Sequence, residues 1–267
     1  MLKDITLGQF FPGNTFVHRL DPRTKLIAVV LYIVAIFLSP GWVSGALMVA
    51  VLCLCVAVSR IPPKALFKGL KPLLFIVILT GFLNLFYTEG RVLVEWWIFR
   101  ITCEGIKRAV LMVLRIMLLV SGTFLLTYTT SPLAITDGLE RLFNPFKKIG
   151  LPVHELSMMM SIALRFIPTL LEETDKIMSA QKARGADFET GSLLDRAKAL
   201  LPILVPLFIS AFRRADELAI AVESRCYNGG AGRTRMKQLR YEGRDYVALT
   251  FGVLLIVAMI GLQVIGL

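Results

Sequence analysis

The hydrophobic residues of this chain collect into five long runs that are separated by polar segments. A membrane-spanning helix needs about 20 apolar residues. The predicted spans are residues 26–38, 42–58, 72–87, 109–127 and 246–267. The first run is short, and we expect it to span only if Arg23 and Lys25 extend their charged ends to the interface. The pattern predicts an all-α polytopic membrane protein with about five spans.

A long charged segment, residues 128–243, separates the fourth and fifth runs. Pro, Gly and Asn residues divide it into three predicted helices, and the last two would be roughly 45–50 Å long at ~1.5 Å per residue. That length exceeds the ~30 Å core of a bilayer. The three helices are residues 132–149, 154–184 and 193–225, the last closed by Asn228-Gly229-Gly230. The predicted domains are residues 1–127 (four spans), 128–243 (long helices) and 244–267 (last span).

Charge sets the predicted orientation of the chain. The net charge is +11, although 56% of the residues are hydrophobic and the mean hydropathy is +0.70. Arg60, Lys64, Lys68 and Lys71 follow the second run with no acidic residue among them, and such basic loops lie on the cytoplasmic side. We therefore expect the N-terminus and the long helices inside and the C-terminus outside. No basic and aromatic binding motif accompanies the charge, which argues against nucleic acid as a partner.

Residues 88–104 form the predicted external loop of the membrane region. They combine mixed charge with a β-like alternation and the adjacent pair Trp96-Trp97. Tryptophan pairs of this kind are typical of the membrane interface.

Catalytic and metal-binding patterns are missing from the sequence. The two histidines, His18 and His154, lie in separate segments, and the four cysteines have no metal-binding spacing. There is no phosphate-binding loop of the GxxxxGK[ST] type. The one dense acidic cluster, Glu172, Glu173 and Asp175, is better explained by local salt bridges. We expect a non-catalytic chain that binds no cofactor itself.

One basic residue, Arg115, lies inside the fourth predicted span. A charge at that depth marks either a substrate pathway or a structural pair. Since none of the predicted spans contains a carboxylate to share a relay, we favour the structural pair.

Two stretches of the long helices resemble one another and end in arginine. Matching residues recur at one spacing: Asp175, Ile177, Ala180, Ala183 and Arg184 in the first, and Asp216, Leu218, Ala221, Ser224 and Arg225 in the second. An arginine in the last helical turn stabilises the helix dipole by ~0.3–1 kcal/mol. A guanidinium is equally suited to docking in a carboxylate-lined groove of a partner. The spacing leaves both interpretations open.

Both long helices also contain internal prolines, Pro168 in one and Pro202 and Pro206 in the other. Proline removes a backbone donor and kinks a helix. Bent helices with an apolar part and a charged tip suit the inner face of a membrane.

Short motifs along most of the chain are similar to those of one known family. They are residues 18–25 (HRLDPRTK), Thr129-Thr130-Ser131, Leu164-Arg165-Phe166-Ile167-Pro168, Ala183-Arg184-Gly185 and a second copy of that last motif at Ser224-Arg225-Cys226. The chain resembles the transmembrane T component, EcfT, of energy-coupling factor (ECF) transporters, which import vitamins and metal ions in prokaryotes.

The resemblance implies the fold, partners and site of the chain. Two crossed coupling helices would each insert an arginine into a groove of one of two ABC ATPase subunits, which bind the ATP. The apolar stretches and the spans would hold a substrate-binding S component in the cell membrane. The implied ATPase-coupling residues are Ala183, Arg184, Gly185, Ser224, Arg225 and Cys226, and the implied supporting residues are Asp175, Asp216, Pro168, Pro202 and Pro206.

The second motif departs from the Ala-Arg-Gly form, because Cys226 stands in the place of glycine. Cysteine tolerates the left-handed backbone of a helix end less well than glycine, so we expect Asn228-Gly229 to end this helix slightly later. Two other functions remain open: a polytopic enzyme that acts on lipid, and a secondary transporter with inverted repeats and polar residues at mid-membrane.

Overall fold

The computed structural model describes residues 10–39, 41–89, 92–96, 99–188, 192–229 and 238–265. Its internal contacts divide the chain into two units. The membrane unit holds the described residues up to Gly138 and those from Gln238 onward, and the long-helix unit holds those from Leu139 to Lys237.

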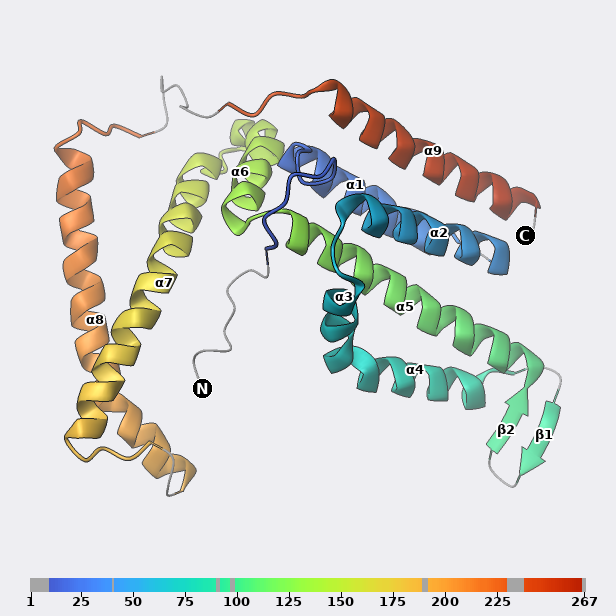
Figure 1. Ribbon diagram of the computed structural model, residues 1–267, viewed down its shortest axis with the longest axis horizontal. Helices are drawn as coiled ribbons and strands as arrows, with labels where there is room; N and C mark the ends of the chain where they lie inside the picture. Colours follow the sequence, from blue (N-terminus) through green and yellow to red (C-terminus); the bar gives the residue numbers. More distant parts are fainter. Residues whose placement is uncertain are drawn as a thin grey trace. The chain divides into compact units, whose positions relative to one another are not determined.

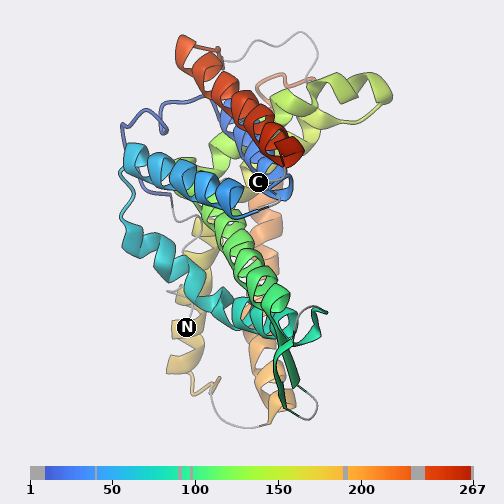
Figure 2. The ribbon, with the colours of Figure 1, turned by 90° about the vertical axis from the view of Figure 1, so that its right-hand side faces the viewer.

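The membrane unit consists of helices that run alongside a central one, α5 (Figure 1). Its elements are α1 (Pro22–Phe37), α2 (Trp42–Ser59), α3 (Pro63–Leu70), the 3-10 turn η2 (Lys71–Leu73), α4 (Leu74–Tyr87), α5 (Cys103–Thr129) and α9 (Gly243–Ile265). Helix α5 contacts α1, α2, α3 and α4, while α9 lies along α1, as both views show (Figures 1 and 2).

Four stretches of helix in the described residues are long and apolar enough to cross a membrane: Trp42–Ser59, Pro63–Tyr87, Cys103–Thr129 and Gly243–Ile265. The all-α polytopic class is therefore confirmed. The first predicted span, residues 26–38, corresponds to α1, which has 16 residues and is shorter than an unassisted span requires.

A two-stranded antiparallel hairpin interrupts the helices between α4 and α5. Its strands are β1 (Val92–Trp96) and β2 (Phe99–Thr102), with Trp96 opposite Phe99. The alternating pattern at residues 88–104 therefore does form strands. The second tryptophan of the predicted pair, Trp97, lies outside the described residues.

Close packing between α1, α2, α5 and α9 forms the core of the membrane unit. Its buried side chains are Ala35, Ile36, Met48, Val51, Leu118, Leu255 and Met259. Gly122 shows how tight the approach is, because a Cβ atom there would lie 2.3 Å from the ring of Tyr32. The hydroxyl of Tyr32 donates to the carbonyl of Leu118 at 3.2 Å, which satisfies the only polar atom of that side chain.

Arg115 makes a structural contact. Its guanidinium donates to the carbonyl oxygen of Ser39 at 2.8 Å, just beyond the end of α1. The carbonyls at a helix C-terminus have no partner within the helix, and a cation there is favourable. This contact supports the structural pair over a substrate pathway.

A buried cluster of charged side chains joins the start of α1 to the start of α9. The carboxylate of Asp245, which is 2% exposed, accepts hydrogen bonds from the backbone N–H of Asp21 and of Glu242, both at 2.8 Å. Asp21 in turn accepts from the guanidinium of Arg23 at 3.0 Å. That guanidinium also lies 4.1 Å from the ring centre of Tyr241.

Lys25 extends this cluster to the end of α5. Its ammonium donates to the carbonyl of Thr129 at 2.9 Å and to the carbonyl of His18 at 3.1 Å. With Lys25, the cluster holds two acidic and two basic side chains, so its net charge is close to zero. A buried charge that is paired in this way avoids most of the penalty of leaving water.

The long-helix unit is built from two helices of 31 residues each, α7 (Val153–Ala183) and α8 (Leu193–Glu223). At ~1.5 Å per residue each is about 46 Å long, as the sequence predicts. Helix α6 (Pro132–Phe143) lies on both sides of the division between the units, and the 3-10 turn η3 (Asn144–Ile149) completes the first predicted stretch.

Replacing Asp245 with Asn tests the buried cluster. The amide nitrogen of the new asparagine side chain would face a backbone N–H donor, and the positive charges of Arg23 and Lys25 would lose a negative partner. We therefore expect the free energy of unfolding to fall by roughly 3–5 kcal/mol, which corresponds to roughly 10 °C in Tm. Thermal unfolding of the detergent-purified chain measures it. Glu242→Gln, which leaves the backbone N–H donor to Asp245 in place, is the control and should change Tm little. An equal Tm for both variants would contradict the assignment.

Candidate functional site at the ends of the two long helices

The first candidate tip is the C-terminus of α7. Arg184 is the capping residue, and Gly185 follows in the left-handed conformation with φ +89°. The N–H of Gly185 donates to Lys182 O and the N–H of Ala186 donates to Gln181 O, both at 3.0 Å. This pair of bonds is the Schellman motif, which satisfies the last carbonyls of a helix.

The second tip, at the end of α8, has the same backbone. Cys226 takes the left-handed conformation with φ +54°. Its N–H donates to Glu223 O at 2.8 Å, and the N–H of Tyr227 donates to Val222 O at 3.3 Å. Arg225 therefore occupies the same position in its motif as Arg184 does in the other. The sequence repeat is also a repeat in three dimensions.

The prediction that Asn228-Gly229 ends α8 is wrong. Helix α8 ends at Glu223, the N–H of Ser224 still donates to Ile220 O at 2.8 Å, and the reversal takes place at Cys226. A residue with a Cβ atom in this conformation costs roughly 1–2 kcal/mol. The two bonds of the Schellman motif offset that cost because they satisfy carbonyls that would otherwise lack a partner.

Every residue of the two tip motifs is exposed: Ala183, Arg184, Gly185, Ser224, Arg225 and Cys226. Neither the guanidinium of Arg184 nor that of Arg225 makes a hydrogen bond or ion pair with another residue in the described part of the chain. The small neighbours leave both groups accessible. Capping of the helix is carried by the backbone, which leaves the side chains available for a partner.

Helices α7 and α8 cross in antiparallel orientation, so their C-termini lie at opposite ends of the pair (Figure 1). At the crossing, Glu173 accepts from the hydroxyl of Ser210 and, at 2.7 Å, from the guanidinium of Arg214. The hydrogen bond from Ser210 and then the charge of Arg214 hold the pKa of Glu173 below its usual value. A salt bridge thus accounts for this member of the acidic cluster, as predicted.

The α7 tip is braced against the start of α8 through a proline. Pro206 has no N–H, so the carbonyl of Pro202 lacks its usual helical donor. The side-chain amide of Gln181 donates to that carbonyl at 3.4 Å. Gln181 precedes Arg184 by less than one helical turn, so a kink in one helix helps to hold the tip of the other.

The α8 tip is braced against the start of α7 in a corresponding way. Tyr227, two residues beyond Arg225, has its hydroxyl 3.4 Å from Nε2 of His154. The other ring nitrogen of His154 lies 3.1 Å from the carboxylate of Glu140 in α6. Each tip is therefore linked to the N-terminal third of the opposite helix, at Pro202 of α8 and at His154 of α7.

The predicted supporting residues lie where the sequence places them, within the helices. Pro168 is inside α7, and Pro202 and Pro206 are inside α8. Asp175 and Asp216 are exposed, and neither carboxylate makes a hydrogen bond or ion pair with a described residue. Their role as supports stays a prediction.

Comparison with known proteins now identifies the family. The model of the CbiQ family, described as cobalt transport protein, matches residues 13–237. A protein of Acidaminococcus fermentans is 54% identical over 96% of this chain and 94% of its own length, and one of Ruminiclostridium cellulolyticum is 53% identical over 92% of each. Both are named energy-coupling factor transporter transmembrane protein EcfT.

The chain belongs to the EcfT family. A Bacillus subtilis protein of the same name is 48% identical over 92% of the chain. The matched residues 13–237 include both tips and most of the buried charge cluster. EcfT membership agrees with the polytopic helical fold and with the resemblance found in the short motifs.

The long-range contacts between the long helices of this EcfT protein could not be found from its sequence. Glu173 is 37 residues from Ser210 and 41 from Arg214, and His154 is 73 residues from Tyr227. No local spacing signals such pairs. Long kinked helices that are antiparallel indicate only that some contact between them exists.

Substitutions of Cys226 test whether the backbone sets the second tip. We expect Cys226→Gly to slow amide hydrogen exchange at the end of α8 by about fivefold or more, because glycine removes a cost of roughly 1–2 kcal/mol. Cys226→Val should speed exchange, since a β-branched residue fits φ +54° poorly. Cys226→Ala, which removes the thiol and keeps the Cβ atom, is the control and should match the wild type. If alanine and glycine behaved alike, the thiol and not the backbone would matter.

Proposed function

We propose that this chain is the coupling subunit of an ECF-type ABC importer for vitamins or other micronutrients. In this role it binds two ABC ATPase subunits at its two tips and a membrane-embedded S component at its apolar surface. ATP binds to the ATPase subunits, and this chain is non-catalytic. The cytoplasmic side holds the N-terminus and the long helices, and the C-terminus lies outside the cell membrane.

The observation that carries the proposal is the repeated tip. Two helices end in the same hydrogen-bonded reversal, and each presents a guanidinium, unpaired among the described residues, beside small exposed residues. A partner that comes in two similar copies fits a surface that comes in two similar copies. The planar fork of arginine forms paired hydrogen bonds with carboxylates, which a lysine cannot reproduce.

The exposed apolar face of α8 supports a membrane partner. Phe208 is 60% exposed and Phe212 is 68% exposed, and Val205 and Ile209 beside them are also exposed. Large apolar patches on a protein mark a lipid or protein contact. The family name refers to a transporter, and within a transporter the S component is the membrane partner that fits this face.

The reciprocal braces suggest how motion passes between the partners. A displacement of one tip acts directly on the start of the other helix, through Gln181 in one case and Tyr227 in the other. The crossing at Glu173 then acts as a pivot between α7 and α8. ATPase subunits that bind the tips differently in two states would shift this pair, since coupling requires differential binding.

Family membership favours this function over a lipid-modifying enzyme or a secondary transporter. An enzyme would act alone in purified form. A coupling subunit copurifies with nucleotide-binding subunits.

Substitution of the two tip arginines tests the proposal. We expect Arg184→Ala or Arg225→Ala to weaken ATPase binding roughly 30-fold or more, as the loss of a docked charge costs about 2–5 kcal/mol. The double variant should lose both assembly and ATP-driven uptake, and Arg→Lys should retain only part. Co-purification of the coexpressed ATPase subunits and cargo uptake into cells are the measurements.

Arg213→Ala is the matched control, because Arg213 is an exposed arginine of α8 away from its tip. It should leave assembly intact. Full assembly and uptake in the Arg184→Ala, Arg225→Ala double variant would refute docking at the tips.

A further inference from the structure

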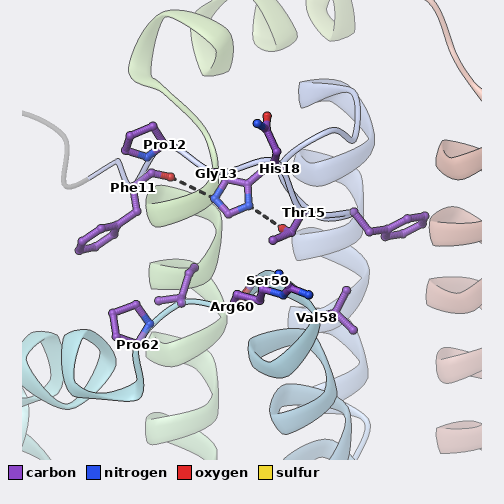
Figure 3. Close-up of a pocket in the computed structure, with 12 residues that line it drawn as sticks. Phe11, Pro12, Gly13, Thr15, His18, Val58, Ser59, Arg60 and Pro62 are labelled. Atoms are coloured by element: carbon purple, nitrogen blue, oxygen red, sulfur yellow. Dashed lines mark hydrogen bonds between the residues drawn. The ribbon is translucent and has the colours of Figure 1, made fainter.

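A cavity of about 600 Å³ lies in the membrane unit between the N-terminal loop and the turn after α2. Figure 3 shows the loop residues from Phe11 to His18 along one side and the residues from Val58 to Pro62 along the other. None of the described residues that line it is acidic. Its size falls within the roughly 300–1,000 Å³ typical of ligand sites.

Tyr128, near the end of α5, holds both walls of this cavity. Its backbone carbonyl accepts from the N–H of Phe11 at 2.9 Å, and its hydroxyl donates to the carbonyl of Ala65 in α3 at 3.2 Å. Tyr128 is only 1% exposed. Tyr128 therefore links the N-terminal loop on one side of the cavity to α3, which follows the other side.

His18 completes the loop wall as a neutral side chain. Its Nε2 donates to the carbonyl of Phe11 at 3.0 Å, so its Nδ1 accepts from the hydroxyl of Thr15 at 2.6 Å. Burial lowers the pKa of His18, which favours the neutral ring. The positive charge of the cavity then comes from Arg60.

Arg60 is in an unusual backbone conformation for an arginine. It follows α2 with φ +55°, where glycine would be free of the cost of roughly 1–2 kcal/mol. Its guanidinium makes no hydrogen bond or ion pair with the other residues that the structure describes. Strain of this kind concentrates at binding sites.

An apolar cavity of about 310 Å³ adjoins the polar one. Phe16 and Val58 line both cavities. The apolar cavity continues between α1, α2, α5 and α9, where Leu54, Leu125 and Phe251 contribute to its walls. The polar cavity, whose Arg60 has no ion-pair partner among the described residues, therefore adjoins an apolar cavity.

We propose that an anionic glycerophospholipid binds here, with its phosphate at Arg60 and an acyl chain in the apolar cavity. The two cavities match the two halves of an amphiphile. The basic residues Lys64, Lys68 and Lys71 follow Arg60 around α3, whose apolar residues Leu66 and Leu70 are buried. Basic pockets next to membrane helices attract anionic headgroups. This site is separate from the tips, so it stands independently of the proposed function.

Binding of phosphatidylglycerol to the detergent-purified full-length chain tests this site, measured as the rise of Tm with lipid concentration. We expect a saturable rise in the wild type that phosphatidylcholine and glycerol 3-phosphate do not produce. Arg60→Asn and Arg60→Gly, which tolerate the left-handed backbone, should weaken the apparent affinity about tenfold or more. Arg60→Lys should retain most of it.

Val58→Trp blocks the junction of the two cavities and should also abolish the rise, although it changes no charge. Lys107→Gln removes a positive charge near the start of α5, far along the helix from Tyr128, and should respond as the wild type. A wild-type response in the Arg60→Asn and Arg60→Gly variants would overturn the proposal. An equal rise of Tm with phosphatidylcholine would also overturn it. A rise of Tm with glycerol 3-phosphate that persists in Val58→Trp would overturn it as well, because it would indicate a site for a free anion.

Discussion

The pairing of the Asp245 carboxylate with the start of α1 is the interaction on which the membrane unit depends. It accepts the backbone N–H of Asp21 and lies within a cluster that also holds Arg23 and Lys25. Charged groups away from water are tolerated only when they are paired and hydrogen-bonded. The charges of the two acidic and two basic groups cancel. The starts of α1 and α9 and the end of α5 can therefore meet at this cluster, where an unpaired charge would destabilise the packing.

The same cluster determines where the N-terminal loop can run. Lys25 binds the carbonyl of His18, and Tyr128, one residue before the Thr129 that Lys25 also contacts, binds the loop at Phe11. The loop wall of the phospholipid cavity is thus fixed by residues whose first role is to close the helix bundle. Residues 18–25, which resemble a family signature, supply several of these contacts. The packing therefore gives a physical reason for that stretch of sequence.

Runs of apolar residues predicted the membrane helices, and Pro, Gly and Asn residues divided the long charged segment into its helices. Gly185 ends α7 as expected, because glycine alone adopts φ +89° without cost. The end of α8 was misjudged because tertiary and backbone hydrogen bonds hold Cys226 in a conformation that its own preference opposes. The sequence could not predict the contact of Glu173 with Arg214 or that of His154 with Tyr227. These residues are far apart in the chain, and only the crossing of α7 and α8 brings them together.

Arg60 and Cys226 are the two residues other than glycine with positive φ in the described part of the chain. Both stand at helix ends, where glycine would give the same reversal at lower free energy. At Cys226 the reversal keeps Arg225 in the position that Arg184 holds on α7. At Arg60 it leaves a guanidinium beside a cavity that contains no other charged side chain among its described lining. At both positions the local backbone preference conflicts with the fold, and each lies at a site where we propose that an arginine binds a partner. Such conflicts are expected at functional sites.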